Sequence, residues 1–583
     1  MKKLIYKLSL GLALLLPMSA CTDTDFLEEA NPNELSTDNF WKSIPDLEMG
    51  MVSVYNTFKD RSILSTVEEN HRSDLTYPGW GRPNTKDIYY LQTFNSASGA
   101  PNNKWQALYK GIFRANQVIE AYERLAPTLT SETEQESANL ILAQARFFRG
   151  LFHFYLHSSF NKGSIIIFDF VPKEEKDFYQ KLQSEDKVRE FFLADLQFAY
   201  ENLPAKWDDK DLGRVTAGAA AAVIGKSYLY QKDYANASVY FKDVIDNYGY
   251  ALTDNIGDNF SSQTEFNSES ILEIAHSLNY KSEENPGAEE QVSTNLAFLL
   301  SPVGGYRSVL PSLWLIDAYR HEEMDENDPR NYFQDEDGND ILKPYSLRAS
   351  YSLAFIDDSL SYYQAPPYHR AKFNNKETAY YRKYTNWETG TTELDINPTQ
   401  RSGINIRVIR LADIYLMYAE ILIEGGTNEA GVAEALMYIN KVRHRSALKM
   451  IGLSSGGEFS GQYDEQVYSA EQVMDHLMYV ERPLELSLEG HAIRHLDMRR
   501  WGITKERFQT LSLEIYHGVD FPFIDEDGKK VTRWSSVLER GEHPVNSAQD
   551  LFDYREAAIN FIPDVHGYWP LPNSEAISNP NIN

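Results

Sequence analysis

The chain has 583 residues, with 85 acidic and 56 basic side chains and a formal net charge of -29 at pH 7. This charge argues against a nucleic-acid ligand, because such binding depends on Lys and Arg side chains that neutralise phosphates. Aromatic residues make up 13% of the chain and include 37 tyrosines, which suit either a large core or a surface that presents rings to a ligand.

Residues 1–20 have the organisation of a secretory signal peptide. Three lysines precede an apolar run at 8–16 that is too short to span a bilayer. Cys21 follows Ser19 and Ala20, an order that resembles a bacterial lipobox. Because Cys21 is the only cysteine, it has no disulfide partner in the chain, and lipidation after cleavage explains its presence. An ordinary signal peptide with an incidental cysteine is the alternative.

Helices are predicted throughout the chain after a polar tether at 21–45. No later apolar run approaches the length of a transmembrane helix, so the lipid is the only membrane contact that we expect. Apolar residues recur at three- and four-residue spacing, which marks one face of a helix. This spacing predicts helices over 45–59, 105–124, 134–160 and 186–203.

The segment that begins at residue 217 fits a tetratricopeptide repeat. With Gly225 at the eighth position, Tyr228, Ala237 and Phe241 fall on the eleventh, twentieth and twenty-fourth. Small residues let two antiparallel helices approach closely, and the large rings fill the groove between them. Because a repeat must stack on neighbours to bury its faces, the preceding helices are its expected partners.

The sequence becomes more irregular after residue 248, which divides the chain into an N-terminal region at 46–248 and a C-terminal region at 249–583. Turn-rich, tyrosine-rich stretches run to about residue 401. Helical periodicity returns over 407–424 and 429–444, and 467–501 is predicted to form two further helices.

Six segments closely resemble the hallmark segments of SusD/RagB nutrient-uptake lipoproteins. They are WQALYKGIFRAN at 105–116, AQARFFR at 143–149, LADIYLMYAE at 411–420, ERPLELSLEG at 481–490, DMRRW at 497–501 and ISNPNI at 577–582. The resemblance extends over nearly the whole mature chain. It implies a mainly α-helical, SusD-like fold, in which tetratricopeptide-like helical pairs pack against a loop-rich ligand-binding region.

The resemblance also implies a function. Such proteins are lipid-anchored at the outer membrane, face the cell exterior and sit as a lid on a SusC-like TonB-dependent β-barrel transporter. They capture oligosaccharides, or peptides in some members, and need no cofactor. The acidic residues that follow Cys21 resemble the export tether of surface lipoproteins from Bacteroidetes-type bacteria.

Charged residues of the hallmark segments are expected to form buried or half-buried ion pairs that organise the helices. They are Arg146, Arg149, Glu420, Glu481, Arg482, Glu485 and Arg494. His491 and His495 are four residues apart, but no Glu or Cys completes a zinc site, so we predict a packing role and no metal. Acidic runs at 325–328, 335–340 and 525–527 do not match an EF-hand loop and are predicted to be surface turns.

Ligand contacts are expected in the irregular loops, in three groups. Aromatic rings stack on the C–H faces of sugars, and planar polar side chains bind the hydroxyls. The alternative for Trp80 is that it fills a gap beneath its loop, and Trp314 has the helical spacing of a core residue. The first group is Trp80 with Arg72, Asp74, Tyr77 and Asn84, the second is Tyr306 and Arg307, and the third is Arg382, Tyr384 and Trp387.

No Gly-rich phosphate loop, Ser-His-Asp signature or Cys-His pair is present. We therefore predict a non-catalytic glycan-binding lipoprotein that delivers oligosaccharides to its transporter. A peptide-uptake member of the same family is one alternative. A surface glycoside hydrolase is another, because paired carboxylates are defined by their separation in space and not by spacing in the sequence.

Overall fold

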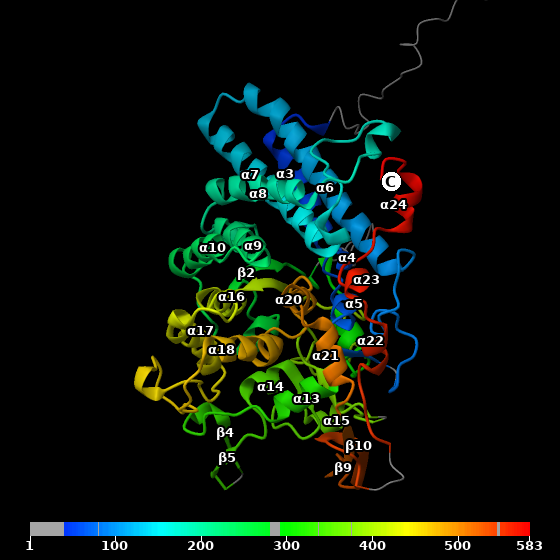
Figure 1. The fold of residues 1–583 in the computed structure, drawn as a ribbon, viewed down its shortest axis with the longest axis vertical. Coiled ribbons are helices and arrows are strands. Elements are labelled where there is room, and N and C mark those ends of the chain that lie inside the picture. The colour runs from blue at the N-terminus through cyan, green and yellow to red at the C-terminus, as the bar shows by residue number, and fades with distance from the viewer. Residues whose placement is uncertain are drawn as a thin grey trace, which may run out of the picture.

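The computed structural model describes residues 40–79, 81–279, 292–335, 337–374, 376–544 and 549–582. The predicted signal peptide, Cys21, most of the predicted tether and Trp80 lie outside these residues. Helices form the framework of the described chain, in agreement with the predicted fold class (Figure 1). None of the described helices is long and apolar enough to cross a bilayer.

From α6 to α10 the N-terminal helices pack each against the next in chain order, while α3 and α4 pack against α6, and α3, α6, α7 and α8 gather at one end of the molecule (Figure 1). The four helices predicted here are confirmed, with bounds that differ by a few residues. The helices are α3 (Ile44–Phe58), α4 (Arg61–Leu64), α5 (Thr66–His71), α6 (Gly99–Leu125), α7 (Glu132–Ser159), α8 (Glu185–Asn202), α9 (Ala217–Tyr230) and α10 (Tyr234–Asn247).

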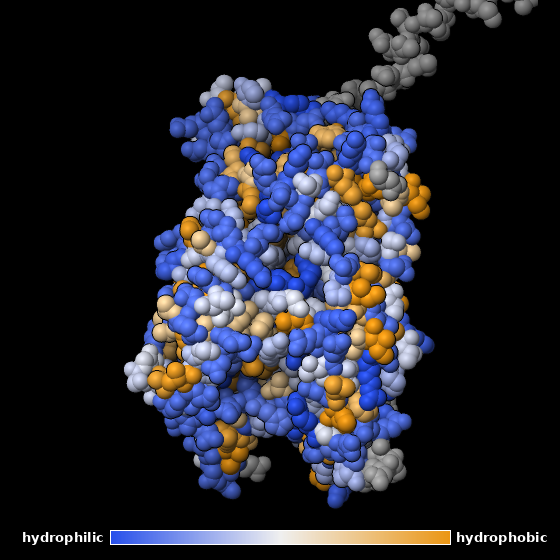
Figure 2. All heavy atoms as spheres, in the orientation of Figure 1, coloured by the Kyte–Doolittle hydropathy of each residue, from blue (hydrophilic) through white to orange (hydrophobic). Residues whose placement is uncertain are grey.

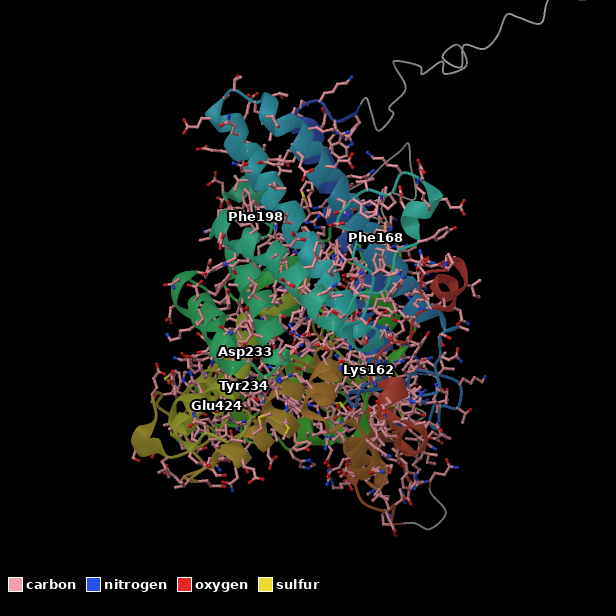
Figure 3. The ribbon with its side chains drawn as sticks, turned by 45° about the horizontal axis from the view of Figure 1, so that its top comes forward. Lys162, Phe168, Phe198, Asp233, Tyr234 and Glu424 are labelled. Atoms are coloured by element: carbon pink, nitrogen blue, oxygen red, sulfur yellow. The ribbon has the colours of Figure 1, made fainter. Side chains whose placement is uncertain are left out.

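Helices α9 and α10 form the predicted tetratricopeptide-like pair. A Cβ atom at Gly225 would lie 2.5 Å from the Phe241 ring, so the glycine is what allows this close approach. The side chain of Asp233 caps α10 by accepting the N–H of Asn236 at 3.1 Å. In Figure 3, Tyr234 at the start of α10 lies near Glu424, which follows the end of α16. The repeat therefore stacks on a helix almost 200 residues later in the chain, as well as on α8.

The C-terminal helices are shorter. Residues 407–410, predicted as the start of a helix, instead belong to a strand, because residues 406–410 pair with another strand. The two helices predicted over 467–501 are present: residues 470–485 are continuously helical and include one π-helical turn, and residues 493–501 form the second helix. The elements are α12 (Leu296–Leu300), α13 (Leu313–Arg320), α14 (Leu347–Ser352), α15 (Pro367–Arg370), α16 (Leu411–Leu422), α17 (Val432–Arg445), α18 (Ala470–His476), the π-helical turn η10 (Leu477–Glu481), α19 (Arg482–Glu485), α20 (Ile493–Trp501), α21 (Thr504–Leu511), α22 (Arg555–Asn560), α23 (Pro563–His566) and α24 (Asn573–Ser578).

The strands of the described chain form five two-stranded antiparallel sheets. Three of these sheets join segments that are far apart in the sequence or separated by a long loop, and the other two are local hairpins. The pairs are β1 (Thr76–Pro78) with β3 (Val309–Pro311), β2 (Ser270–Ile274) with β8 (Ile406–Arg410), β4 (Tyr332–Gln334) with β5 (Asp340–Leu342), β6 (Leu353–Phe355) with β7 (Ala379–Tyr381), and β9 (Tyr516–Ile524) with β10 (Lys530–Arg540).

The β4–β5 and β9–β10 hairpins project from one end of the molecule, and the surface is notched between them (Figures 1 and 2). Asp335 and Asp525 each accept backbone N–H groups within their hairpin turns, at 2.8–3.1 Å. The predictions of acidic surface turns at 335–340 and 525–527 are therefore confirmed for the described residues. The prediction for 325–328 is wrong at Asp325, which is buried because its carboxylate accepts the N–H groups of Asn327 and Gln462.

Two large hydrophobic cores hold the fold together. The first joins the N-terminal helices to α16, α17 and α18, so it draws on both sides of residue 248. The second surrounds β1, β3, β6, β7 and α13, and it contains Trp314, as predicted. Because the first core contains residues from both sides of this boundary, the predicted division into regions at 46–248 and 249–583 stays a prediction.

Candidate functional site

Strand pairing brings the first two predicted groups together. In the β1–β3 sheet, Tyr77 lies opposite Leu310, and the Gly79 N–H donates to the Ser308 carbonyl at 3.1 Å. A Cβ atom at Gly79 would collide with the carbonyl oxygen of Arg307, so only glycine allows the two backbones to lie this close. The loop that follows β1 therefore runs beside the loop that precedes β3.

The segments on either side of Arg382 and Tyr384 reach the same surface, and Trp387 is the member of the third predicted group that lies on it. Arg307 Nη1 lies 2.8 Å from Glu377 Oε2, and the Glu393 N–H donates to the Val303 carbonyl at 3.0 Å. Arg82 donates to the Lys376 carbonyl at 3.2 Å. These contacts unite four loops into one surface, which we call the loop face. It consists of residues 79, 81–84, 301–308, 372–374, 376–378 and 386–401.

Aromatic and apolar side chains are accessible on the loop face. Tyr306 is 51% exposed, and the ring of Phe298 supports it from below at a centroid distance of 4.5 Å. Trp387 is partly buried, with its ring 5.8 Å from that of Tyr351. Leu394 is also exposed. A ring that is held on one side and open on the other can stack on the apolar face of a ligand.

Two residues of the first group lie beneath the surface. Arg72 pairs with Glu69 at 2.9 Å, and its guanidinium lies 3.6 Å over the Trp569 ring. Asp74 is fully buried and accepts two hydrogen bonds of 2.7 Å from Arg494 and one of 2.8 Å from Arg507. Burial opposes ionisation of Asp74, but these guanidiniums hold its pKa below the usual value. In this conformation neither Arg72 nor Asp74 reaches a ligand.

Tyr77 and Asn84 shape the loop after β1. The Tyr77 ring is buried beneath the Arg82 guanidinium, which lies 4.2 Å from the ring centroid. The Tyr77 hydroxyl accepts the N–H of Asn84. The Asn84 amide donates to the Gly79 carbonyl at 3.2 Å, which closes the loop on itself. Tyr77 thus supports the loop from inside, whereas Asn84 keeps a partly exposed side chain.

Arg382 and Tyr384 are also buried, contrary to the expectation that they lie in an open loop. Arg382 donates to the Ser361 carbonyl at 2.6 Å, and its guanidinium lies 5.3 Å over the Trp387 ring. Tyr384 packs edge-on against Phe260 at 5.2 Å. Of the predicted contacts that the structure describes, Asn84, Tyr306, Arg307 and Trp387 have accessible side chains. Tyr77 contacts Asn84 and Arg382 contacts Trp387, whereas Arg72, Asp74 and Tyr384 are buried against other parts of the fold. A ligand-binding role stays a prediction for every one of them.

Sequence reasoning missed Glu393, a fully buried carboxyl group at the centre of the loop face. It accepts hydrogen bonds from the Tyr363 hydroxyl and, at 2.7 Å, from the Asn386 amide. The Tyr363 hydroxyl oxygen also lies 2.8 Å from the Ser301 hydroxyl, so Tyr363 and Glu393 together link two of the loops. Burial raises the pKa of Glu393, although its hydrogen bonds oppose the shift. The surrounding Thr-Thr-Glu-Leu-Asp segment reads as an exposed turn, so no signal in the sequence marked it.

The predicted ion pairs of the hallmark segments are confirmed. Each hallmark residue has an oppositely charged partner, and only Arg146 has a side chain that is appreciably exposed. The pairs are Arg146 and Arg149 with Asp195, Glu420 with Arg500, Glu481 with Arg348 and Arg443, Arg482 with Asp413 and Asp497, Glu485 with Arg348, Arg410 and Arg445, and Arg494 with Asp74.

The predicted packing role of the two histidines is also confirmed. His491 stacks on Tyr155 with centroids 3.7 Å apart, and His495 Nε2 lies 3.1 Å from the Gly567 carbonyl oxygen. Burial lowers the pKa of both well below the usual value. Among the residues that the structure describes, no group of acidic, His or Cys side chains is arranged to hold a metal ion.

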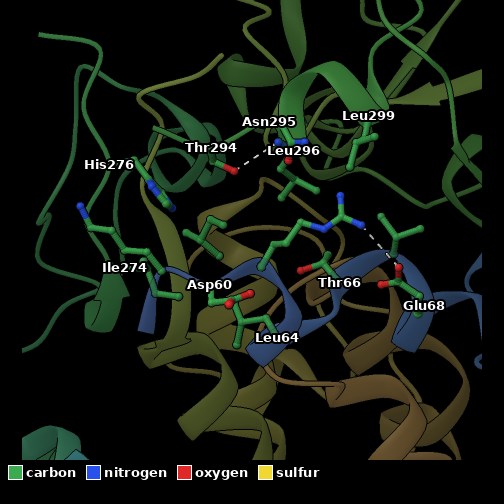
Figure 4. Close-up of a pocket in the computed structure, with 14 residues that line it drawn as sticks. Asp60, Leu64, Thr66, Glu68, Ile274, His276, Thr294, Asn295, Leu296 and Leu299 are labelled. Atoms are coloured by element: carbon green, nitrogen blue, oxygen red, sulfur yellow. Dashed lines mark hydrogen bonds and ion pairs between the residues drawn. The ribbon is translucent and has the colours of Figure 1, made fainter. Parts of the chain in front are cut away.

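A small cavity lies behind the loop face, between α4 and α5 on one side and α12 on the other (Figure 4). Among the residues that line it, Arg61 Nη2 lies 3.7 Å from Glu68 Oε1. The Leu296 N–H donates to the Thr294 hydroxyl at 3.2 Å. Burial lowers the pKa of His276 at its edge to about 3, so this side chain is neutral at ordinary pH. The cavity volume of about 40 Å³ admits water and not a sugar ring.

Comparison with known proteins assigns the fold to a family. The sequence model of the SusD family matches residues 268–583, and a model described as starch-binding and associating with the outer membrane matches residues 25–229. A SusD-like protein of Bacteroides ovatus is 26% identical over 447 residues, which cover 74% of each chain.

Solved structures agree with the sequence match. The crystal structure of a SusD superfamily protein from Bacteroides vulgatus superposes with a TM-score of 0.69 at 22% identity, over 93% of this chain and 99% of the other. A protein described as a laminarin-binding SusD-like protein gives a TM-score of 0.59 at 23% identity, over 80% of this chain and 94% of the other. The family match extends over more than half of the chain, and the chain therefore belongs to the SusD family.

Proposed function

We propose that this protein captures glycan chains on its loop face without cleaving them. The observation that carries the proposal is the half-exposed ring of Tyr306, which is supported from below by Phe298 and flanked by the Arg307–Glu377 ion pair. Sugar rings stack on such an aromatic face, and planar polar groups beside it bind the hydroxyls. The starch-binding description of the second matching family model supports a glycan ligand.

Two buried carboxyl groups of the loop face, Glu377 and Glu393, are not placed for catalysis. Glycoside hydrolysis uses two carboxyl groups that flank the scissile bond and reach it directly. Glu377 has a side chain only 3% exposed and is paired with Arg307, while Glu393 is enclosed by Tyr363 and Asn386. Both groups are occupied with holding loops together, which suits a rigid recognition surface.

We further propose that lipid on Cys21 anchors the protein to the outer membrane, facing the cell exterior, and that a SusC-like TonB-dependent β-barrel transporter receives the captured glycan. The lipobox-like order before Cys21 and the outer-membrane association in the family description support the anchor. Cys21→Ala is expected to release a folded, ligand-binding protein from the cell surface. Membrane fractionation and surface labelling measure this, and a Cys21→Ala protein that stays membrane-bound would refute the anchor.

Affinity electrophoresis tests the glycan proposal, with laminarin, starch, xylan and xyloglucan cast separately into native gels. At least one polysaccharide should retard the wild-type protein. Trp80→Ala should weaken that retardation, by at least about 1 kcal/mol in binding free energy, without lowering the melting temperature. A collapse in melting temperature would instead make Trp80 a packing residue.

Other outcomes would redirect the assignment. Binding of peptides and of no glycan would make the protein a peptide-uptake member of the family. Release of oligosaccharides from a polysaccharide, abolished by a single carboxylate substitution, would establish an enzyme. A pull-down of the wild-type protein from solubilised outer membranes tests the transporter, and recovery of no β-barrel partner would argue against delivery.

A further inference from the structure

A second aromatic pocket lies in the helical part of the molecule. The loop between α8 and α9 forms one wall, the chain that follows α10 forms another, and the segment leading into β2 completes it. Its volume is about 390 Å³, within the usual range for small-molecule sites. We call it the α8–α9 pocket. It shares no lining residue with the loop face.

Four aromatic side chains line this pocket, and each is partly exposed. They are Trp207, Tyr248, Tyr250 and Phe266. The rings of Tyr248 and Tyr250 lie 6.2 Å apart with 23° between their planes, so the two rings are nearly parallel. Trp207 is fixed in position because its Nε1–H donates to the Val215 carbonyl at 2.8 Å. The pocket thus presents ring faces that need no rearrangement to receive a flat apolar surface.

Polar groups are placed between these rings. The Arg214 guanidinium lies 5.5 Å from the Trp207 ring and is held by Asp211 at 2.9 Å and by Glu48 at 3.1 Å. The hydroxyls of Thr216 and Tyr250 lie 3.3 Å apart and can each bond to a further partner. Lys206 is exposed at the rim and forms no ion pair with the described residues.

We propose that the α8–α9 pocket is a second saccharide site, which takes one or two sugar residues of a glycan independently of the loop face. Rings fixed side by side match the apolar C–H face of a pyranose, and the guanidinium and hydroxyls match its equatorial hydroxyl groups. Charge favours a neutral ligand, because Asp211 and Glu48 already neutralise Arg214 and the chain is strongly acidic. Two sites on separate parts of one protein would raise its avidity for a long polysaccharide.

Saturation-transfer difference NMR measures the binding of neutral trisaccharides to the full-length protein. Four trisaccharides are tested: maltotriose, cellotriose, laminaritriose and xylotriose. Tyr248→Ala removes one of the aromatic rings that line the pocket. Ala205→Trp fills the pocket from an exposed lining position and removes no contact. At least one trisaccharide should bind the wild type, and both variants should weaken a component of that binding at least about fivefold.

Two control variants separate this site from the loop face. Tyr332→Ala removes a tyrosine from the distant β4–β5 hairpin and should leave all binding unchanged. Tyr306→Ala should keep the component of trisaccharide binding that is lost in Tyr248→Ala. Melting temperatures of all variants should match the wild type, and Ala205→Trp still tests the pocket if Tyr248→Ala unfolds.

The outcomes distinguish the two proposals. Loss of all binding in Tyr306→Ala, with none in Tyr248→Ala or Ala205→Trp, would overturn the second site and support the loop face. Loss only in Tyr248→Ala and Ala205→Trp would support the pocket and show that Tyr306 binds none of these trisaccharides, and the polysaccharide gels would then decide the loop face. Absence of binding to all four trisaccharides in the wild type would overturn the second site, while the polysaccharide gels still decide the proposed function.

Discussion

The helical framework and the loop face differ in how far their charged side chains are buried. Between the helices, Glu485 is fully buried and contacts three guanidiniums, with Arg410 at 2.7 Å. On the loop face, the Arg307–Glu377 pair keeps a guanidinium that is 25% exposed, and the open positions hold rings such as Tyr306. Because removal of charges from water is costly, a buried network persists only where nearly every partner is present. The framework is therefore intolerant of change, whereas side chains on the loop face are free to vary with the ligand.

Substitution of Glu485 is expected to cause the largest loss of stability. Glu485→Gln removes a buried carboxylate that Arg410 and Arg445 share. Glu269 and Glu489 then remain to offset Arg410, and Glu269 remains to offset Arg445. We expect the free energy of unfolding to fall by roughly 3–5 kcal/mol, measured by urea denaturation. In the matched control, Glu458→Gln breaks a half-exposed pair with Lys441 and should cost less than about 1 kcal/mol. Equal losses in the two variants would contradict the contrast.

Asp74 tests where the boundary between the two regions runs. It lies in the first predicted ligand group but contacts Arg494 and Arg507 in the framework. Asp74→Asn keeps the shape and removes the charge, and we expect the free energy of unfolding to fall by about 3 kcal/mol while the folded protein keeps its glycan affinity. Urea denaturation and affinity electrophoresis measure the two quantities. Lost affinity with unchanged stability would return Asp74 to the binding site.

His153 gives the framework a dependence on pH. It is fully buried on α7, and burial lowers its pKa to about 4. A neutral buried histidine stabilises the fold above the unfolded-state pKa of about 6.5, and this contribution is lost as the pH falls toward 4. Relative to His153→Gln, the wild type should lose roughly 2 kcal/mol of stability between pH 7 and pH 5. Parallel stability curves for the two proteins would show that His153 does not titrate in this way.

Sequence patterns predicted the framework better than the loop face, for a physical reason. Helical periodicity and the hallmark charges are local signals, and residues such as Glu481 and Arg482 proved to be ion-paired as expected. Strand β8 was misread because its pairing with β2 is set by a partner more than 130 residues earlier. Burial of Arg72 was missed for the same reason, since its guanidinium lies against His566 and Trp569. Arg382 is instead buried by nearer parts of the chain, Ser361 and Trp387.

Composition nevertheless located the candidate site. Aromatic residues beside glycines marked two loops and a tyrosine-rich stretch marked a third, and strand pairing and backbone contacts join parts of these segments into one surface. Which side chains face outward could not be read from the sequence, because exposure depends on how the loops cross. Glu393 is the clearest example. Its carboxyl group is buried because it accepts hydrogen bonds from Tyr363, in a neighbouring turn, and from Asn386, in its own loop.

Tyr306→Ala should produce the smallest change in stability and the clearest change in function. The ring is half exposed and packs against Phe298, so little buried area is lost and the melting temperature should stay within about 2 °C of the wild type. Glycan affinity should fall by about 1 kcal/mol, roughly fivefold, because one stacking contact disappears. Tyr306→Phe keeps the ring and should retain most of the affinity, which separates stacking from hydrogen bonding by the hydroxyl. Isothermal titration with the polysaccharide retained in the gels measures both variants. If Tyr306→Ala instead lowers stability as much as Asp74→Asn, the loop face belongs to the framework and ligand binding must be sought elsewhere.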